Sequence, residues 1–188
     1  EEIYVYMQTN YGTSVTPFYT TLALWVGGIV LVALMKVKVD YEDDEFKDAT
    51  EHQKYMGRAL LFLAMGQLQA LVVVLGDLYI LKIDCTHPFM LWLAAAITSF
   101  VFTLFIYTLV LTFGDLGKAI AVVMIVLQIA GSGGTYPIEL LPEFFQNVYL
   151  YFPFPYAINA MREAISGLYQ CDYAVFLVKL CTYAVISL

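Results

Sequence analysis

Charged residues are scarce in this sequence. Asp, Glu, Lys and Arg make up 13% of its 188 residues and apolar residues 61%, whereas a soluble domain is about a quarter charged and half apolar. The apolar residues form long blocks separated by short polar stretches, which predicts several membrane-spanning helices and a cell-membrane location. No basic stripe is present, so we expect no nucleic-acid partner.

Motifs for chemistry are also missing. The stretch GDLGKA at 114–119 lacks the glycine spacing of a phosphate-binding loop and the Ser or Thr that follows its Lys, so any ATP-driven role needs another polypeptide. His52 and His87 are predicted to lie on opposite sides of the membrane, which excludes a shared metal site. No nucleophile motif occurs. We therefore expect neither an enzyme nor a bound metal or cofactor.

Signals at the two ends of the chain are lacking as well. The sequence opens with Glu1 and Glu2 instead of a signal peptide, and it stops inside the apolar run YAVISL. We therefore expect a piece of a longer polypeptide.

Three cysteines are present. Cys85 and Cys171 are predicted to lie on the same outer side, where they could form a disulfide or remain two free thiols, and Cys181 lies in a predicted span.

Five apolar blocks predict an all-α, polytopic transmembrane bundle. The predicted spans are about 17–35, 59–81, 89–113, 117–134 and 173–188, and residues 1–16 are interpreted as the end of an extracellular domain. Basic residues favour the cytoplasmic side. If the first span runs inward, the inner loops hold six bases (Lys36, Lys38, Lys47, Lys54, Arg58 and Lys118) and the outer segments two (Lys82 and Arg162). Residues 36–58 and 114–118 are thus predicted to be cytoplasmic.

The fourth apolar block ends in an unusual way, in QIAGSGGTYPIELLPEFF at 128–145. Glycines and a proline are expected to break the helix there: Gly131, Gly133, Gly134 and Pro137. Two short amphipathic helices should follow within about 138–168, because apolar residues recur at helical spacing on either side of a proline pair. They could lie flat on the outer surface, but the persistent apolar character favours a re-entrant pair that dips into the outer leaflet before the last span.

Several polar residues allow two interpretations. Arg162 could pair with a glutamate and fix the packing of the two short helices, or Glu139 could gate or line an outward cavity, with Glu163 the other acid concerned. The glutamines inside spans, at positions 67, 69 and 128, either bond neighbouring helices or line a substrate path. Asp77 is interpreted as an interface anchor within reach of Lys82.

Long stretches of the chain resemble a known family. LQIAGSGGTYPIELLPEFFQ, continued by FPFPYAINAMREAISGLY, is similar to the carboxy-terminal membrane domain of the YhgE/Pip family, the phage infection proteins of Gram-positive bacteria. NYGTSVTPFYTTLALWVG, HQKYMGRALLFL and QALVVVLGDL extend the resemblance over nearly the whole chain. It implies an amino-terminal span, a large extracellular domain and then five spans that resemble the type-two membrane domain of ABC exporters.

This resemblance implies a function. The leading hypothesis is a permease in the lipid bilayer that acts as a homodimer, moves or displays a cell-envelope substrate, and works with a separate cytoplasmic ATPase subunit. The alternative is a cell-surface phage receptor or envelope scaffold, whose spans only anchor an extracellular domain that binds a phage or envelope component. The long loop 36–58 has an acidic middle that includes Asp43, Asp44 and Glu45. It is interpreted either as a solvated linker or as a docking loop for the ATPase.

Overall fold

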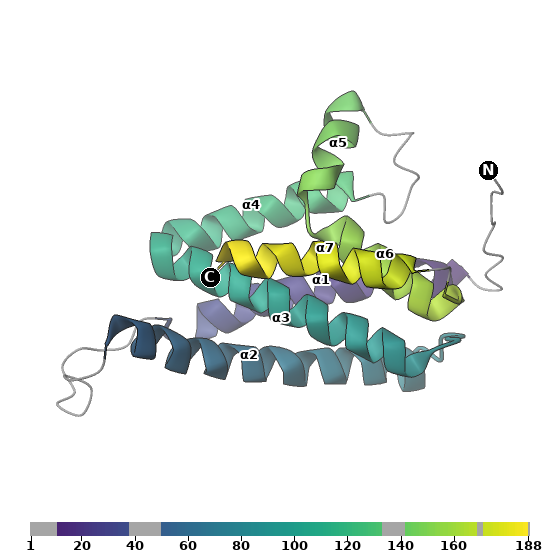
Figure 1. The fold of residues 1–188 in the computed structure, drawn as a ribbon, viewed down its shortest axis with the longest axis horizontal. Helices are drawn as coiled ribbons and strands as arrows, with labels where there is room; N and C mark the ends of the chain where they lie inside the picture. Colours follow the sequence, from purple (N-terminus) through teal and green to yellow (C-terminus); the bar gives the residue numbers. More distant parts are fainter. Residues whose placement is uncertain (1–10, 38–49, 133–141, 169–170, 188) are drawn as a thin grey trace.

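The computed structural model describes residues 11–37, 50–132, 142–168 and 171–187. Within these ranges it is an all-α bundle, which confirms the predicted fold class (Figure 1). Its elements are α1 (Tyr11–Leu34), α2 (Glu51–Leu75) with a π-helical end (Gly76–Ile80), α3 (Pro88–Phe113), α4 (Asp115–Gly131), α5 (Glu143–Val148) with a 3-10 turn (Tyr149–Tyr151), α6 (Phe154–Ser166) and α7 (Asp172–Ser187).

Three of these helices are long and apolar enough to cross a membrane. They cover Gly12–Leu34, His52–Ile80 and Pro88–Phe113. The helices α4 and α7, with 17 and 16 residues, are shorter, and their spanning remains a prediction. The first helix begins at Tyr11, six residues before the expected start at Pro17, and carries that proline inside it. Residues 11–16, interpreted from the sequence as part of the end of an extracellular domain, therefore belong to the first helix.

Local signals set the helix ends. Thr50 caps α2 through a capping box, in which its hydroxyl accepts from the Gln53 N–H while the Gln53 side chain accepts from the Thr50 N–H. Pro88 occupies the first turn of α3, where its missing N–H costs nothing. Gly114 has φ 61°, which a residue without a Cβ adopts readily, and turns the chain from α3 into α4.

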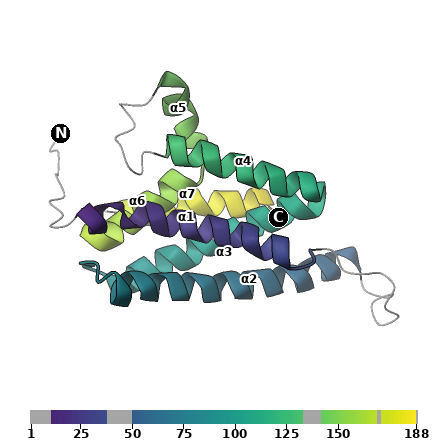
Figure 2. The ribbon, with the colours of Figure 1, turned by 180° about the vertical axis from the view of Figure 1, so that it is seen from behind.

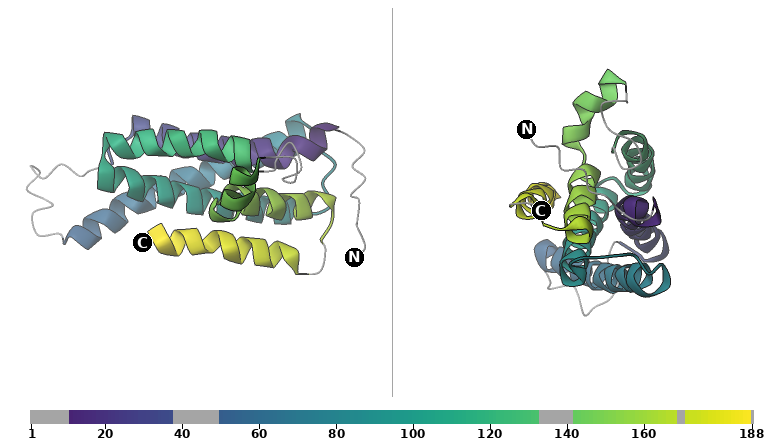
Figure 3. Two further views of the ribbon diagram at one scale, coloured as in Figure 1. Left: turned by 90° about the horizontal axis from the view of Figure 1, so that it is seen from above. Right: turned by 90° about the vertical axis from the view of Figure 1, so that its right-hand side faces the viewer.

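The bundle has two ends. At the α2–α3 end, residues 81–87 connect α2 to α3; at the α3–α4 end, Gly114 connects α3 to α4. The long helices run side by side between these ends, and α3 lies among α1, α2, α4, α6 and α7 (Figures 1 and 3). Thirteen residues of α3, distributed around its circumference, are buried. A helix buried all round forms the core of a bundle, so α3 is its central element.

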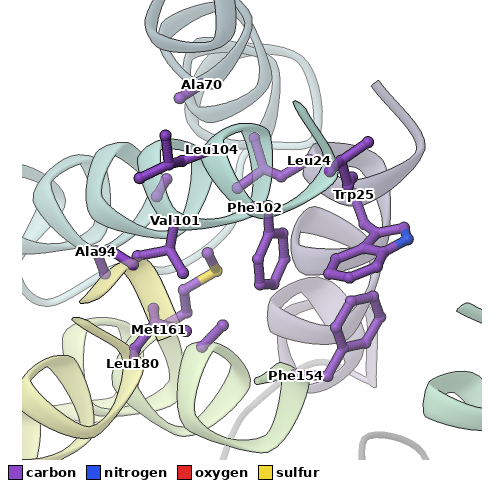
Figure 4. Close-up of a cluster of buried hydrophobic side chains, with 14 of the residues drawn as sticks. Leu24, Trp25, Ala70, Ala94, Val101, Phe102, Leu104, Phe154, Met161 and Leu180 are labelled. Carbon is purple, nitrogen blue, oxygen red and sulfur yellow. The ribbon is translucent and has the colours of Figure 1, made fainter. Parts of the chain in front are cut away.

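An aromatic cluster occupies the middle of the core. The Trp25 ring lies edge-on to the rings of Phe102 and Phe154, with centroids 4.9 and 5.5 Å away, and the two phenylalanines stack at 5.4 Å (Figure 4). The Trp25 indole N–H donates to the Ala121 carbonyl at 3.2 Å. One cluster thus joins α1, α3, α4 and the first residue of α6.

The outward faces of the bundle are apolar. On α2 and α4, large side chains are exposed at helical spacing: Leu60, Leu68, Val72, Val122, Val123 and Val126. In water such a continuous surface would drive association. It suits a bilayer, whose hydrocarbon solvates apolar side chains.

Candidate functional site

The end of α4 packs tightly against α5. A Cβ built on Gly131 would lie 2.8 Å from Cδ1 of Phe145, so this ring rests on the glycine and leaves no room for a side chain. The α5 helix starts directly after Pro142 and stands away from the bundle, across the direction of the long helices (Figure 2). The other residues predicted at the break (Gly133, Gly134 and Pro137), together with Glu139, lie outside the described residues, and their roles remain predictions.

The helix α6 runs from the middle of the bundle to the α2–α3 end. Its first residue, Phe154, belongs to the central aromatic cluster. Near its last turn, the carbonyls of Ala164 and Ile165 accept the backbone N–H groups of His87 and Thr86, each at 3.1 Å. Thirteen residues at 1.5 Å each give about 20 Å of length. Gly167, with φ 120°, then ends the helix.

The two sides of α6 differ from the sequence prediction in one respect. Ile158, Met161 and Ile165 are buried, as their spacing predicted. An amphipathic helix is expected to expose a glutamate, yet only 8% of Glu163 is exposed. The helix α6 packs against α1, α3 and α7, which leaves little of its surface open.

A polar hollow of about 460 Å³ opens beside α6 at the α2–α3 end. It contains both signs of charge, and its walls come from the start of α1, the second half of α6 and the start of α7: Ser14, Asn159, Arg162, Glu163, Ser166, Asp172 and Phe176. An Arg162 Nη1–H donates to Oδ1 of Asn159 at 3.4 Å. The structure thus brings Arg162 and Glu163 to one hollow, while the predicted gate or packing role of this pair stays a prediction.

Two of the three span glutamines join helices. The amide of Gln67 donates to the Ala96 carbonyl on α3 at 3.0 Å, and that of Gln69 donates to the Ala23 carbonyl on α1 at 2.9 Å. Both therefore have the helix-to-helix role, one of the two roles considered. Gln128 on α4 differs, because it is fully buried and neither polar atom of its amide has a hydrogen-bond partner.

Sequence reasoning missed a contact between α1 and α2. Asp77 is buried in the π-helical end of α2, and its Oδ2 accepts the Thr20 hydroxyl at 2.6 Å. It is thus not an exposed interface anchor beside Lys82. Thr13, Thr16 and Thr20 are buried along one face of α1. Their spacing could have revealed this face, but residues 1–16 were interpreted as the end of an extracellular domain.

The α3–α4 end has a hollow of its own, of about 350 Å³, between the end of α1, Val110 and the start of α4. At its rim the Lys118 ammonium lies 3.0 Å from Oδ1 of Asp115. The candidate docking residues Asp43, Asp44 and Glu45 lie outside the described residues, so their role is still a prediction. Within the described ranges, no group of three His, Cys, Asp or Glu residues could hold a metal ion.

The three cysteines are free thiols in the structure. Cys85, in the α2–α3 connection, is half-buried and donates to the Ala164 carbonyl at 3.6 Å. Burial raises the pKa of this thiol, and a backbone hydrogen bond from His87 partly opposes the shift. Cys171 and Cys181 are exposed.

Comparison with known proteins identifies the family. A family model described as ABC-2 type transporter, membrane domain, matches residues 52–165, which include α2, α3, α4 and the described parts up to α6. The protein YhgE of Bacillus subtilis (strain 168), itself named uncharacterized, is 32% identical over 158 residues. The match covers 84% of this chain but 20% of YhgE, so the chain spans about a fifth of that relative's length. No solved structure matches. The chain is therefore a YhgE-like membrane domain and belongs to the ABC-2 type transporter family.

Proposed function

We propose that this domain is the permease part of an exporter, which moves a cell-envelope substrate across the membrane with energy from a separate cytoplasmic ATPase subunit. The observation that carries the proposal is the family match over 52–165, which includes the whole region around the helix break. The chain itself has no phosphate-binding loop. In our proposal, hydrolysis is supplied from outside this domain, by the separate ATPase subunit.

The path of α5 and α6 supports a re-entrant pair within this permease. The first turn of α6 lies in the central aromatic cluster with Trp25 and Phe102, and the last turn bonds the α2–α3 connection. A surface-lying helix would make no contact with the core of the bundle. In our proposal, α6 rises from mid-membrane to the outer side, and α5, which lies across the long helices, leads the chain back to the bundle at the start of α6.

The two ends of the bundle then have different roles. We place the α3–α4 end and the loop 36–58 in the cytoplasm, following the bias of basic residues. The acidic residues Asp43, Asp44 and Glu45 would bear on the ATPase. The polar hollow with Arg162 and Glu163 would face outward. The apolar outer face of α4 and the projecting α5 fit a homodimer, because a second copy could cover both.

The coupling is tested by pull-down of the full-length protein from its native membranes. Neutralising Asp43, Asp44 and Glu45 together, to Asn, Asn and Gln, should weaken recovery of an ATPase subunit, and the difference from the native protein should be largest at low ionic strength, where charges are least screened. A matched control neutralises three acids on the predicted outer side, Glu1, Glu2 and Asp84. It should leave the recovery unchanged.

The rival function is a phage receptor or envelope scaffold, in which the spans serve only as an anchor. Replacing the spans with unrelated ones of equal length would leave the phenotype of a scaffold intact and abolish that of a transporter. Recovery of no ATPase with either protein would contradict the coupling and favour the scaffold.

Orientation has a separate test: single cysteines at positions 44 and 146 should be labelled from opposite sides of the membrane, and labelling of both from outside would refute the topology.

A further inference from the structure

One seam of α4 faces the bundle and changes character towards the helix break. Its buried residues follow helical spacing, and the first three are small or apolar: Gly117, Ala121 and Ile125. One turn further on stand Gln128 and Ser132, which are 0% and 2% exposed. The last two positions of a buried apolar seam are therefore polar.

Neither residue has a partner within the described part of the chain. There, the amide nitrogen and oxygen of Gln128 and the hydroxyl of Ser132 are buried without a hydrogen bond. Gln67 and Gln69 show the usual arrangement, since each donates to a carbonyl of the adjacent helix. A buried polar group without a partner is costly, and such groups are rare in native proteins. Two of them one turn apart indicate a place that is completed by a group outside the described part of the chain.

The chemistry of the pair limits what it can bind. An amide and a hydroxyl each offer a donor and an acceptor and carry no charge. A neutral hydroxyl or amide group matches both. An anion such as a phosphate would need a cation or several donors to offset the cost of its burial, and Gln128 and Ser132 supply neither.

The helix α5 lies beside this place. Gly131 lies between the two polar residues in sequence, and the Phe145 ring rests directly on it. The helix α5 has only six residues and projects from the bundle, so it has little packing of its own to hold it there. Movement of this one helix would uncover the end of the seam.

We propose that Gln128 and Ser132 form a binding site for a neutral hydroxyl- or amide-bearing group, which enters when the Phe145 ring leaves Gly131. The assignment of that group to an exported substrate rests on the permease function proposed above. The site itself does not, because it is defined by the burial and the missing partners of two side chains on one helix face.

The test measures labelling, so its outcome is independent of transport. In the full-length protein freed of other cysteines, Ser132→Cys is reacted in native membranes with two reagents of similar size, hydroxyethyl and sulfonatoethyl methanethiosulfonate. Native Cys171, as the single thiol, is the exposed reference. We expect the rate ratio of neutral to anionic reagent to exceed that at Cys171 about tenfold, since a charge is poorly accommodated in the site. Adding Gln128→Leu should lower the neutral rate about fivefold, as loss of one hydrogen bond does; Gln67→Leu, the control, should not.

The covering role of α5 is tested with the same cysteine at position 132. Phe145→Ala should accelerate the neutral reagent, whereas Leu150→Ala, which removes an exposed side chain from the turn after α5, should have no effect. Equal ratios at positions 132 and 171, with no effect of Gln128→Leu, would indicate a merely water-filled space and overturn the proposal. Absence of any reaction at position 132, even with Phe145→Ala, would overturn it too. Either failure leaves the ATPase pull-down result untouched, so the two proposals fall separately.

Discussion

Gly27 on α1 packs against Gln69 on α2, and this contact predicts a substitution whose effect on stability changes sign when Gln69 is removed. Gly27 on α1 leaves space for the amide of Gln69, and a Cβ at this glycine would lie 1.6 Å from its Nε2. The clash involves only the end of a flexible side chain, so the backbone need not move. Gly27→Ala should instead expel the amide from its hydrogen bond to the Ala23 carbonyl, 2.9 Å long in the native protein.

The magnitude follows from two opposing terms. Leaving the amide and its carbonyl without each other costs about 1–3 kcal/mol, and Ala gains about 0.5–1 kcal/mol over Gly inside a helix. Gly27→Ala should therefore lower the free energy of unfolding by about 1 kcal/mol, the difference of these terms. In a Gln69→Ala background the new Cβ has room, and the same substitution should raise the free energy by about 0.5–1 kcal/mol.

The assay is equilibrium unfolding of the four proteins of this cycle in mixed micelles, with increasing denaturing detergent. Gly57→Ala is the matched control, because nothing lies within 4 Å of its Cβ position, and it should stabilise the protein in both backgrounds. The coupling energy between positions 27 and 69 should be about 2 kcal/mol, within the range known for residues in contact. The reasoning is refuted if Gly27→Ala has the same sign and size with and without Gln69.

Three further predictions concern packing and reactivity. A Cβ at Gly117 would lie 2.3 Å from the backbone carbonyl oxygen of Leu109, so Gly117→Ala should force α3 and α4 apart and cost more than about 3 kcal/mol in the same unfolding assay, the upper range for overpacking. Phe154→Ala should cost about 3 kcal/mol and expose the end of α6 to limited proteolysis, because its ring fills the central cluster; unchanged proteolysis would contradict the anchoring. Iodoacetamide should alkylate the half-buried Cys85 more slowly than the exposed Cys171. Because burial raises the pKa of Cys85, its reactive thiolate form decreases at a given pH, and its rate should still be rising above pH 9; a plateau below pH 8 in mass-spectrometric rates would refute this.

Much of the candidate site could be predicted from local patterns. The apolar face of α6, its end at Gly167, and the start of α5 directly after Pro142 all follow from residue spacing and from the backbone preferences of glycine and proline. Such signals depend on neighbours in the chain and need no knowledge of distant contacts. The helix α1 begins six residues before the predicted span: its threonines look polar in sequence, and only their burial in the bundle explains why the helix includes them.

The sequence by itself determined the membrane location and the all-α class, because both depend on long apolar blocks that any helical arrangement must place in hydrocarbon. The tertiary structure alone decided what each polar side chain does. Gln67 and Gln128 are the same residue type in similar blocks, yet one bonds a neighbouring helix and the other has no partner. Glu163 is buried on a helix that packs against three others, and Asp77 meets Thr20 from 57 positions away. Each of these outcomes depends on which helices pack together and in which register, and hydropathy and spacing within one helix carry no information about either.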